Sequence, residues 1–191
     1  MTVQVLLSET VRSRLRNELR RAGSNEIGGV LAGEDLGDGR FLIVDISVQR
    51  NGGGFAHFVR DSSIHRRFMR RFFARTGNQY GRYNYLGEWH SHPSFSTQPS
   101  STDARQMQQL IENEDQQANF LILVIAKLDR LGEVEASAHA FRRGLFPIKV
   151  LLSTRVGKAV KEPQTISARL SKAWLTWRKE SSALTQGARQ R

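Results

Sequence analysis

The order in which helical and strand patterns follow one another constrains the fold of this chain most strongly. Apolar residues recur at helical spacing in three segments before residue 115, namely 8–22, 62–75 and 101–114. Short apolar segments typical of strands lie between and after them, without the regular alternation of a parallel α/β protein. At 191 residues the chain is also too short for a large α/β barrel, which needs about 250. The pattern predicts an α+β fold, a central mixed β-sheet flanked by helices.

The expected strands are short and apolar. They cover residues 3–7, 27–32, 41–48, 55–59, 85–90, 119–127, 135–142 and 146–152. The longest uninterrupted apolar run, 120–126, is far shorter than the ~20 residues that a membrane-crossing helix requires. The N-terminus lacks the basic start and long apolar middle of an export signal. We therefore expect a soluble, cytoplasmic protein without a membrane span.

Composition limits the chemistry and divides the chain. There is no cysteine, so a hydrolytic reaction would depend on a metal, on a serine or threonine, or on paired carboxylates. The net charge is +11, and residues 152–191 carry nine lysines and arginines against two glutamates. This shift predicts a domain over 1–152 and a basic C-terminal extension over 153–191. The arginine-rich face of the 62–75 segment is either a solvated helix face or a contact for an acidic substrate.

The extension contains an apolar stripe at helical spacing. Its members are Ile166, Leu170, Trp174 and Trp177. Two tryptophans on one face of a basic helix expose too much apolar area to remain in water, so the stripe should cover something. Its own domain, a partner protein and an anionic membrane are all open interpretations. Nucleic acid is not the expected partner, because no nucleic-acid-binding motif accompanies the charge.

Two histidines and one aspartate carry the strongest chemical signal. Residues i and i+2 of a strand share a face, so His90 and His92 can present their imidazoles side by side. Asp103, in the first turn of the next helix, becomes a third ligand if the loop folds back. Two histidines and a carboxylate, with one coordination position left for water, are typical of a catalytic zinc site.

Each part of this signal has a simpler interpretation. A His-x-His pair can be two ordinary histidines, and Ser100 with Asp103 also fits a capping box at a helix start. The two motifs together, within fourteen residues and joined by a proline-flanked loop, favour the metal. Other His-x-His enzymes fit less well, because cupins are all-β jelly rolls and this chain has three expected helices.

The spacing resembles the JAMM signature of the JAB/MPN metalloprotease family. His90-x-His92-Pro93, six residues, Ser100, two residues and Asp103 fill every fixed position. Residues 26–33, Glu-Ile-Gly-Gly-Val-Leu-Ala-Gly, are similar to the early glutamate element of that family, Glu-x-Gly-Gly-x-Leu-x-Gly. The resemblance covers about residues 1–150. Within the family, the sequence looks most like stand-alone bacterial JAB proteins, which often accompany E1-like and E2-like partners.

The resemblance implies a role for each of these residues. His90, His92 and Asp103 would hold Zn²⁺. Glu26 would act as general base toward the attacking water and then as acid toward the departing amine. Ser100 would donate a hydrogen bond to the developing oxyanion. Glu88 is a competing base, and it could equally orient His90, with which it shares a strand face.

The function implied is that of a zinc-dependent, deubiquitinase-like isopeptidase or peptidase. It would remove or mature a ubiquitin-like modifier, whose tail adds as a strand to an exposed sheet edge. The alternatives are a processing protease for a sulfur-carrier-type β-grasp protein and a non-catalytic MPN scaffold, although scaffolds typically lose ligands that are intact here. His57, His65 and His139 lack ligand spacing, so ordinary surface or half-buried roles are expected for them.

Overall fold

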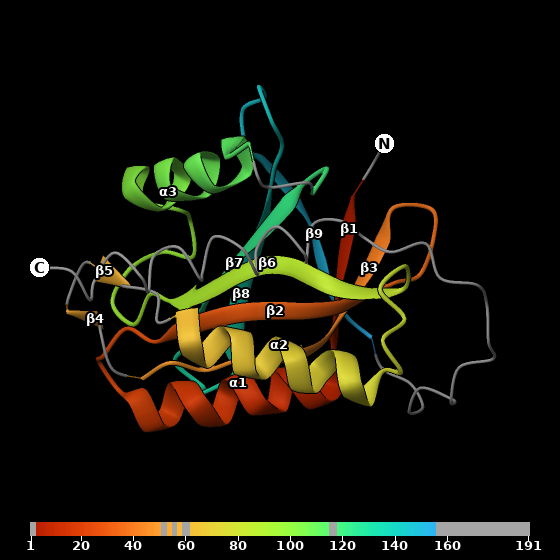
Figure 1. Cartoon of the computed structure of the whole chain (residues 1–191). Coiled ribbons are helices and arrows are strands. Elements are labelled where there is room, and N and C mark those ends of the chain that lie inside the picture. The colour runs from red at the N-terminus through yellow and green to blue at the C-terminus, as the bar shows by residue number, and fades with distance from the viewer. Residues whose placement is uncertain (1–2, 51–52, 55–56, 59–61, 115–117, 156–191) are drawn as a thin grey trace, which may run out of the picture.

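The computed structural model describes residues 3–50, 53–54, 57–58, 62–114 and 118–155. Seven strands form the main sheet: β1 (Gln4–Ser8), β2 (Gly28–Asp35), β3 (Arg40–Ile46), β6 (Tyr83–Ser91), β7 (Leu121–Leu128), β8 (Val134–Phe141) and β9 (Ile148–Arg155). Their spatial order is β1-β3-β2-β6-β7-β8-β9 (Figure 1). The pairs β1–β3, β1–β9 and β6–β7 are parallel and the others are antiparallel, so the sheet is mixed as predicted. A separate two-stranded sheet joins β4 (Gly53–Gly54) and β5 (His57–Phe58).

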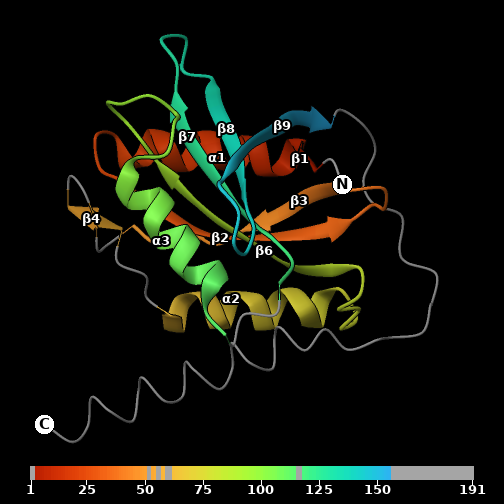
Figure 2. The ribbon, with the colours of Figure 1, turned by 90° about the horizontal axis from the view of Figure 1, so that it is seen from above.

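Among the described residues, three helices pack on the main sheet, and all three were predicted. They are α1 (Glu9–Ala22), α2 (Ser62–Arg75) and α3 (Ser101–Glu112). Figure 2 shows α1 on one side of the strands and α2 and α3 on the other. Ser8 caps α1, because its hydroxyl oxygen accepts a hydrogen bond from the Val11 amide at 3.2 Å. Within the described part of the chain, no helix is both long and apolar enough to cross a membrane.

The sheet differs from the prediction because it closes into a barrel. Val5 in β1 pairs with Phe41 in β3 and also with Leu152 in β9, which joins the two ends of the sheet. Apolar periodicity identifies strands, but it does not identify the partner of a strand that lies far away in the chain. Closure also removes most free edges, since of the described strands only β4 and β5 lie outside the barrel.

In the described part of the chain, the core consists of one large cluster and two smaller ones. The large cluster surrounds the fully buried Trp89 and includes the apolar stripe of α1, with Leu15 at its centre. A second cluster lies beneath α2 around Phe73, and a third beneath α3 around Ile111. The α1 side and the α2–α3 side of the strands are therefore packed separately, which holds β6 rigidly between them.

The glycines of the early Glu-x-Gly-Gly-x-Leu-x-Gly element allow close packing around β2. A Cβ atom on Gly29 would lie 2.1 Å from the carbonyl oxygen of Ser47, and one on Gly33 would lie 2.0 Å from Cδ1 of Leu86. Because the atom next to Gly29 belongs to the backbone and cannot turn away, that residue must be glycine for β2 to approach its neighbour, whereas at Gly33 the Leu86 side chain would have to move. The motif therefore has a packing function as well as carrying Glu26.

Candidate metal centre

The two histidines lie at the end of a central strand. His90 is in β6, between Gly28 of β2 and Ile125 of β7, and His92 follows directly after the strand. The amide of His92 still donates to the carbonyl of Ala126, at 3.0 Å. Both histidines are only 8% exposed, so their rings are held by packing on a rigid strand end.

The donor atoms of His90, His92 and Asp103 converge on one point. The two Nε2 atoms are 3.1 Å apart, His90 Nε2 is 3.4 Å from Asp103 Oδ1, and His92 Nε2 is 3.5 Å from Asp103 Oδ2. Tetrahedral zinc with ligands at 2.0–2.1 Å separates its donors by about 3.3 Å. The donor set and its spacing therefore fit Zn²⁺.

The loop after β6 orients His92. Its Nδ1 lies 2.8 Å from the carbonyl oxygen of Ser96, which can only accept, so Nδ1 carries the proton and Nε2 keeps a free lone pair. The hydroxyl of Ser137 in β8 donates to the carbonyl of Thr97 and attaches the same loop to the barrel. Neither contact is predictable from the sequence, because any residue type has a backbone carbonyl that can accept a hydrogen bond.

Ser100 and Asp103 form the capping box that was the alternative interpretation. The Ser100 amide donates to Asp103 Oδ2 at 2.7 Å, and the Asp103 amide donates to the Ser100 hydroxyl oxygen at 3.1 Å. The box also turns the Asp103 carboxylate toward the two histidines, so capping and ligation are compatible. The exposed Ser100 hydroxyl accepts in the cap, and its side-chain hydrogen bond with Asp103 helps to lower the pKa of that carboxylate.

The electrostatics favour a charged carboxylate in this cluster. Burial raises the pKa of Asp103, but contacts with His90 and His92 outweigh burial and hold that pKa well below its usual range. The pKa of His92 is raised by its contact with Asp103, against the effect of burial, and the Ser96 carbonyl and the Glu26 charge add to the rise. A cation bound between these groups would meet an ionised Asp103 at neutral pH.

Glu26 lies beside the cluster but outside the converging set. It lies two residues before the first residue of β2, and continuing the register that pairs Gly28 with His90 places Glu26 opposite His92. Two hydrogen bonds between Ile27 and Ser91 hold this register, from the Ile27 amide to Ser91 Oγ (2.9 Å) and from the Ser91 amide to the Ile27 carbonyl (2.8 Å). Glu26 is half-buried, and its charge acts on His92.

Glu88 has a different environment. It is 8% exposed and accepts a hydrogen bond from the Tyr85 hydroxyl at 3.4 Å. The donor cluster does not include it. Glu88 therefore lies in the packed interior on the α2–α3 side of the sheet, two residues before His90 on β6.

The remaining histidines are more buried than expected. His65 is 1% exposed and its Nδ1 lies 2.8 Å from the hydroxyl of Ser47, while His139 is 6% exposed. His65 lies on the buried face of α2 and His139 lies in β8, and the spacing of histidines in the sequence does not indicate either burial. The side chain of His57 and the apolar stripe of the C-terminal extension lie outside the described residues.

Comparison with known proteins identifies the family. The family model described as prokaryotic homologs of the JAB domain matches residues 8–142, which include every residue of the donor cluster. The chain belongs to this family of prokaryotic JAB-domain proteins.

Individual proteins resemble the chain in sequence and in fold. One from Enterobacter hormaechei subsp. hoffmannii, named CD-NTase/cGAS isopeptidase, is 30% identical over 146 residues, which are 76% of this chain and 79% of that protein. A solution structure of a Desulfitobacterium hafniense protein is 18% identical, with a TM-score of 0.56 over 80% of this chain and 93% of the other. The second similarity concerns the fold alone.

Proposed function

We propose that this protein is a zinc-dependent isopeptidase or peptidase that removes or matures a ubiquitin-like modifier. The observation that carries the proposal is the convergence of the His90, His92 and Asp103 donor atoms at zinc-like separations. Membership of the JAB family and the name of the Enterobacter relative support the isopeptidase reaction. A complete donor set argues against a purely structural scaffold.

The reaction would be an attack of water on the carbonyl of an amide or isopeptide bond. Zn²⁺ held by His90, His92 and Asp103 would supply a water of lowered pKa and polarise the carbonyl. Glu26, beside His92, would accept the proton of the attacking water and return it to the leaving amine nitrogen. The exposed Ser100 hydroxyl, beside Asp103 at the start of α3, would donate to the developing oxyanion.

We assign the catalytic domain to residues 1–152 together with the end of β9, which continues to Arg155, and the basic extension to the residues that follow. The substrate would be a protein conjugate or precursor, and E1-like and E2-like proteins are the expected partners. Phe95 packs edge-on against the ring of His92, with centroids 6.4 Å apart, and stays 57% exposed. It is therefore placed to form an apolar wall beside the bond that is cleaved.

The test combines metal analysis with cleavage. The purified full chain should contain one zinc per molecule and cleave a ubiquitin-like fusion or a CD-NTase conjugate after the C-terminal residue of the modifier. A chelator should abolish cleavage, and added zinc should restore it. Protein that contains no zinc after zinc reconstitution, or cleavage that persists in chelator, would overturn the proposal.

A further inference from the structure

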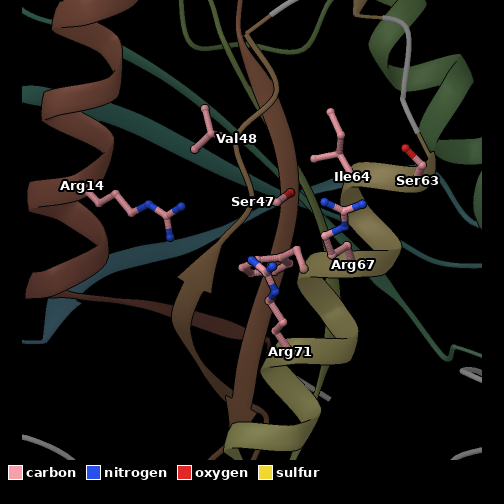
Figure 3. A pocket seen from close by; sticks show the side chains of 8 residues that line it. Arg14, Ser47, Val48, Ser63, Ile64, Arg67 and Arg71 are labelled. Carbon is pink, nitrogen blue, oxygen red and sulfur yellow. The ribbon is translucent and has the colours of Figure 1, made fainter.

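A hollow lined by arginines lies between α1 and α2, over the end of β3. Its volume is about 360 Å³, which is near the lower end of the range of ligand pockets. Figure 3 shows Arg14 reaching toward it from α1, and Arg67 and Arg71 from α2. None of the described residues that line it is acidic.

The positive charge around the hollow is only partly balanced. Arg14 donates to Asp45 at 2.6 Å, and Asp45 also binds Arg75, so one carboxylate serves two arginines. Arg67 and Arg71 are exposed and pair with no carboxylate of the described residues. They are four residues apart on one helix face, which brings their side chains to the same ligand.

The hollow also has an apolar side. Val48, Ile64 and Phe68 line it, and Ile64 is 40% exposed. A fitting ligand combines negative charge with an apolar stem, as a glutamate side chain on a peptide does. Binding of a nucleic acid strand typically uses aromatic rings as stacking platforms, whereas the ring of Phe68, the one aromatic residue among the described lining residues, is partly buried.

The register of the strands places the Val48 edge of this hollow about two strands from His90. Gln49, next to the lining residue Val48, pairs with Gly28, and Gly28 pairs with His90. Two strand spacings amount to about 10 Å. An extended peptide advances about 3.3 Å per residue, so a residue about three positions from the cleaved bond spans this distance.

We propose that the hollow binds an acidic side chain of the protein substrate, about three or more residues from the bond that is cleaved. This inference rests on the proposed function, because it assigns the ligand to the substrate of the metal centre. Arg67 and Arg71 would then select substrates that carry an acidic residue at the right distance. They would do so without contacting the reacting atoms.

The test measures binding and requires no turnover. Full-length Glu26→Gln protein is titrated into fluorescein-labelled hexaglutamate, with hexaglutamine as the neutral probe, in low-salt buffer, and fluorescence anisotropy is recorded. Only hexaglutamate should bind. Adding Arg67→Gln and Arg71→Gln together should weaken binding about five- to tenfold, the size expected for two exposed ion pairs.

A matched variant separates the hollow from the general charge of α2. Arg66→Gln with Arg70→Gln removes the same charge from the same helix outside the hollow, and should change binding by less than about twofold. Equal weakening by both double variants would overturn the proposal. A second result would also overturn it: a single-stranded DNA oligomer of equal charge binds more tightly than hexaglutamate, and only the Arg67/Arg71 variant loses this binding. The site would then recognise phosphate. Absence of cleavage by the wild-type chain would count against the proposed function and leave this binding result standing.

Discussion

Asp103 belongs both to the capping box of α3 and to the donor cluster. The change Asp103→Asn preserves the size of the side chain and one oxygen, but removes the charge that faces His90 and His92. Changes beside metal ligands already reduce metal affinity 10–100-fold. We therefore expect loss of the ligand itself to lower zinc affinity by more than about 100-fold, measured by competition with a chelator.

A control for this change lies on the surface. Asp38 has a side chain that is 93% exposed and a φ of 54°, a conformation that asparagine tolerates. Asp38→Asn should leave zinc affinity unchanged. Full zinc occupancy in Asp103→Asn under the same competition would show that Asp103 is not a ligand.

Glu26 should be required for turnover but not for metal. It lies outside the set of converging donors, so Glu26→Gln should keep the fold and the zinc while losing about 10²–10⁴-fold in kcat. Glu88→Gln is the matched comparison, and its kcat should fall much less. If Glu26→Gln cleaves normally and Glu88→Gln is inactive, the role of general base belongs to Glu88.

Among the elements, β2 depends on the absence of a side chain at one position. Gly29→Ala would place a Cβ atom 2.1 Å from the Ser47 carbonyl oxygen, which is backbone and cannot move aside. We expect a loss of at least about 2 kcal/mol in the free energy of unfolding, measured by denaturant titration. Gly81→Ala is the control, because open space surrounds that position; similar losses in both variants would refute the close-approach argument.

His139 in strand β8 makes the free energy of unfolding depend on pH. Burial and then the charge of Lys149 lower the pKa of His139, and its buried Nδ1 lacks a hydrogen-bond partner among the described residues. As the pH falls, His139 is therefore protonated in the unfolded chain before it is protonated in the folded one. The stability that is present above about pH 6.5 is lost as the pH falls toward the lowered pKa of the folded state. His139→Gln should flatten this dependence between pH 7 and about pH 5 in thermal unfolding. An unchanged slope would contradict it.

At the scale of the whole molecule, the basic extension is predicted to be a docking element. Deleting residues 160–191 should leave a protein that folds and cleaves a minimal linear fusion, because the barrel and the donor cluster lie within residues 3–155. The truncated protein should lose efficiency on the full conjugate, measured as kcat/KM. Aggregation after truncation would instead show that the apolar stripe belongs to the core.

The features that were predictable from the amino-acid sequence depend on interactions between residues close together in the chain. The three helices follow from apolar residues at 3.6-residue spacing and from caps such as Ser8, which depend on neighbours within one turn. The strand that carries His90 and His92, and the capping box of Ser100 and Asp103, are equally local. The short spacing between these two pairs made a metal centre predictable as a hypothesis.

The contacts between segments far apart in the chain became known only from the tertiary structure. The closure of the sheet depends on β1 pairing with β9, and the place of Glu26 opposite His92 depends on a register held by Ile27 and Ser91. The arginine hollow likewise joins α1 to α2 across β3. Such contacts are selected by the packing of the whole core, and no spacing within one segment records them, because the free energy that chooses a partner comes from burial summed over the fold.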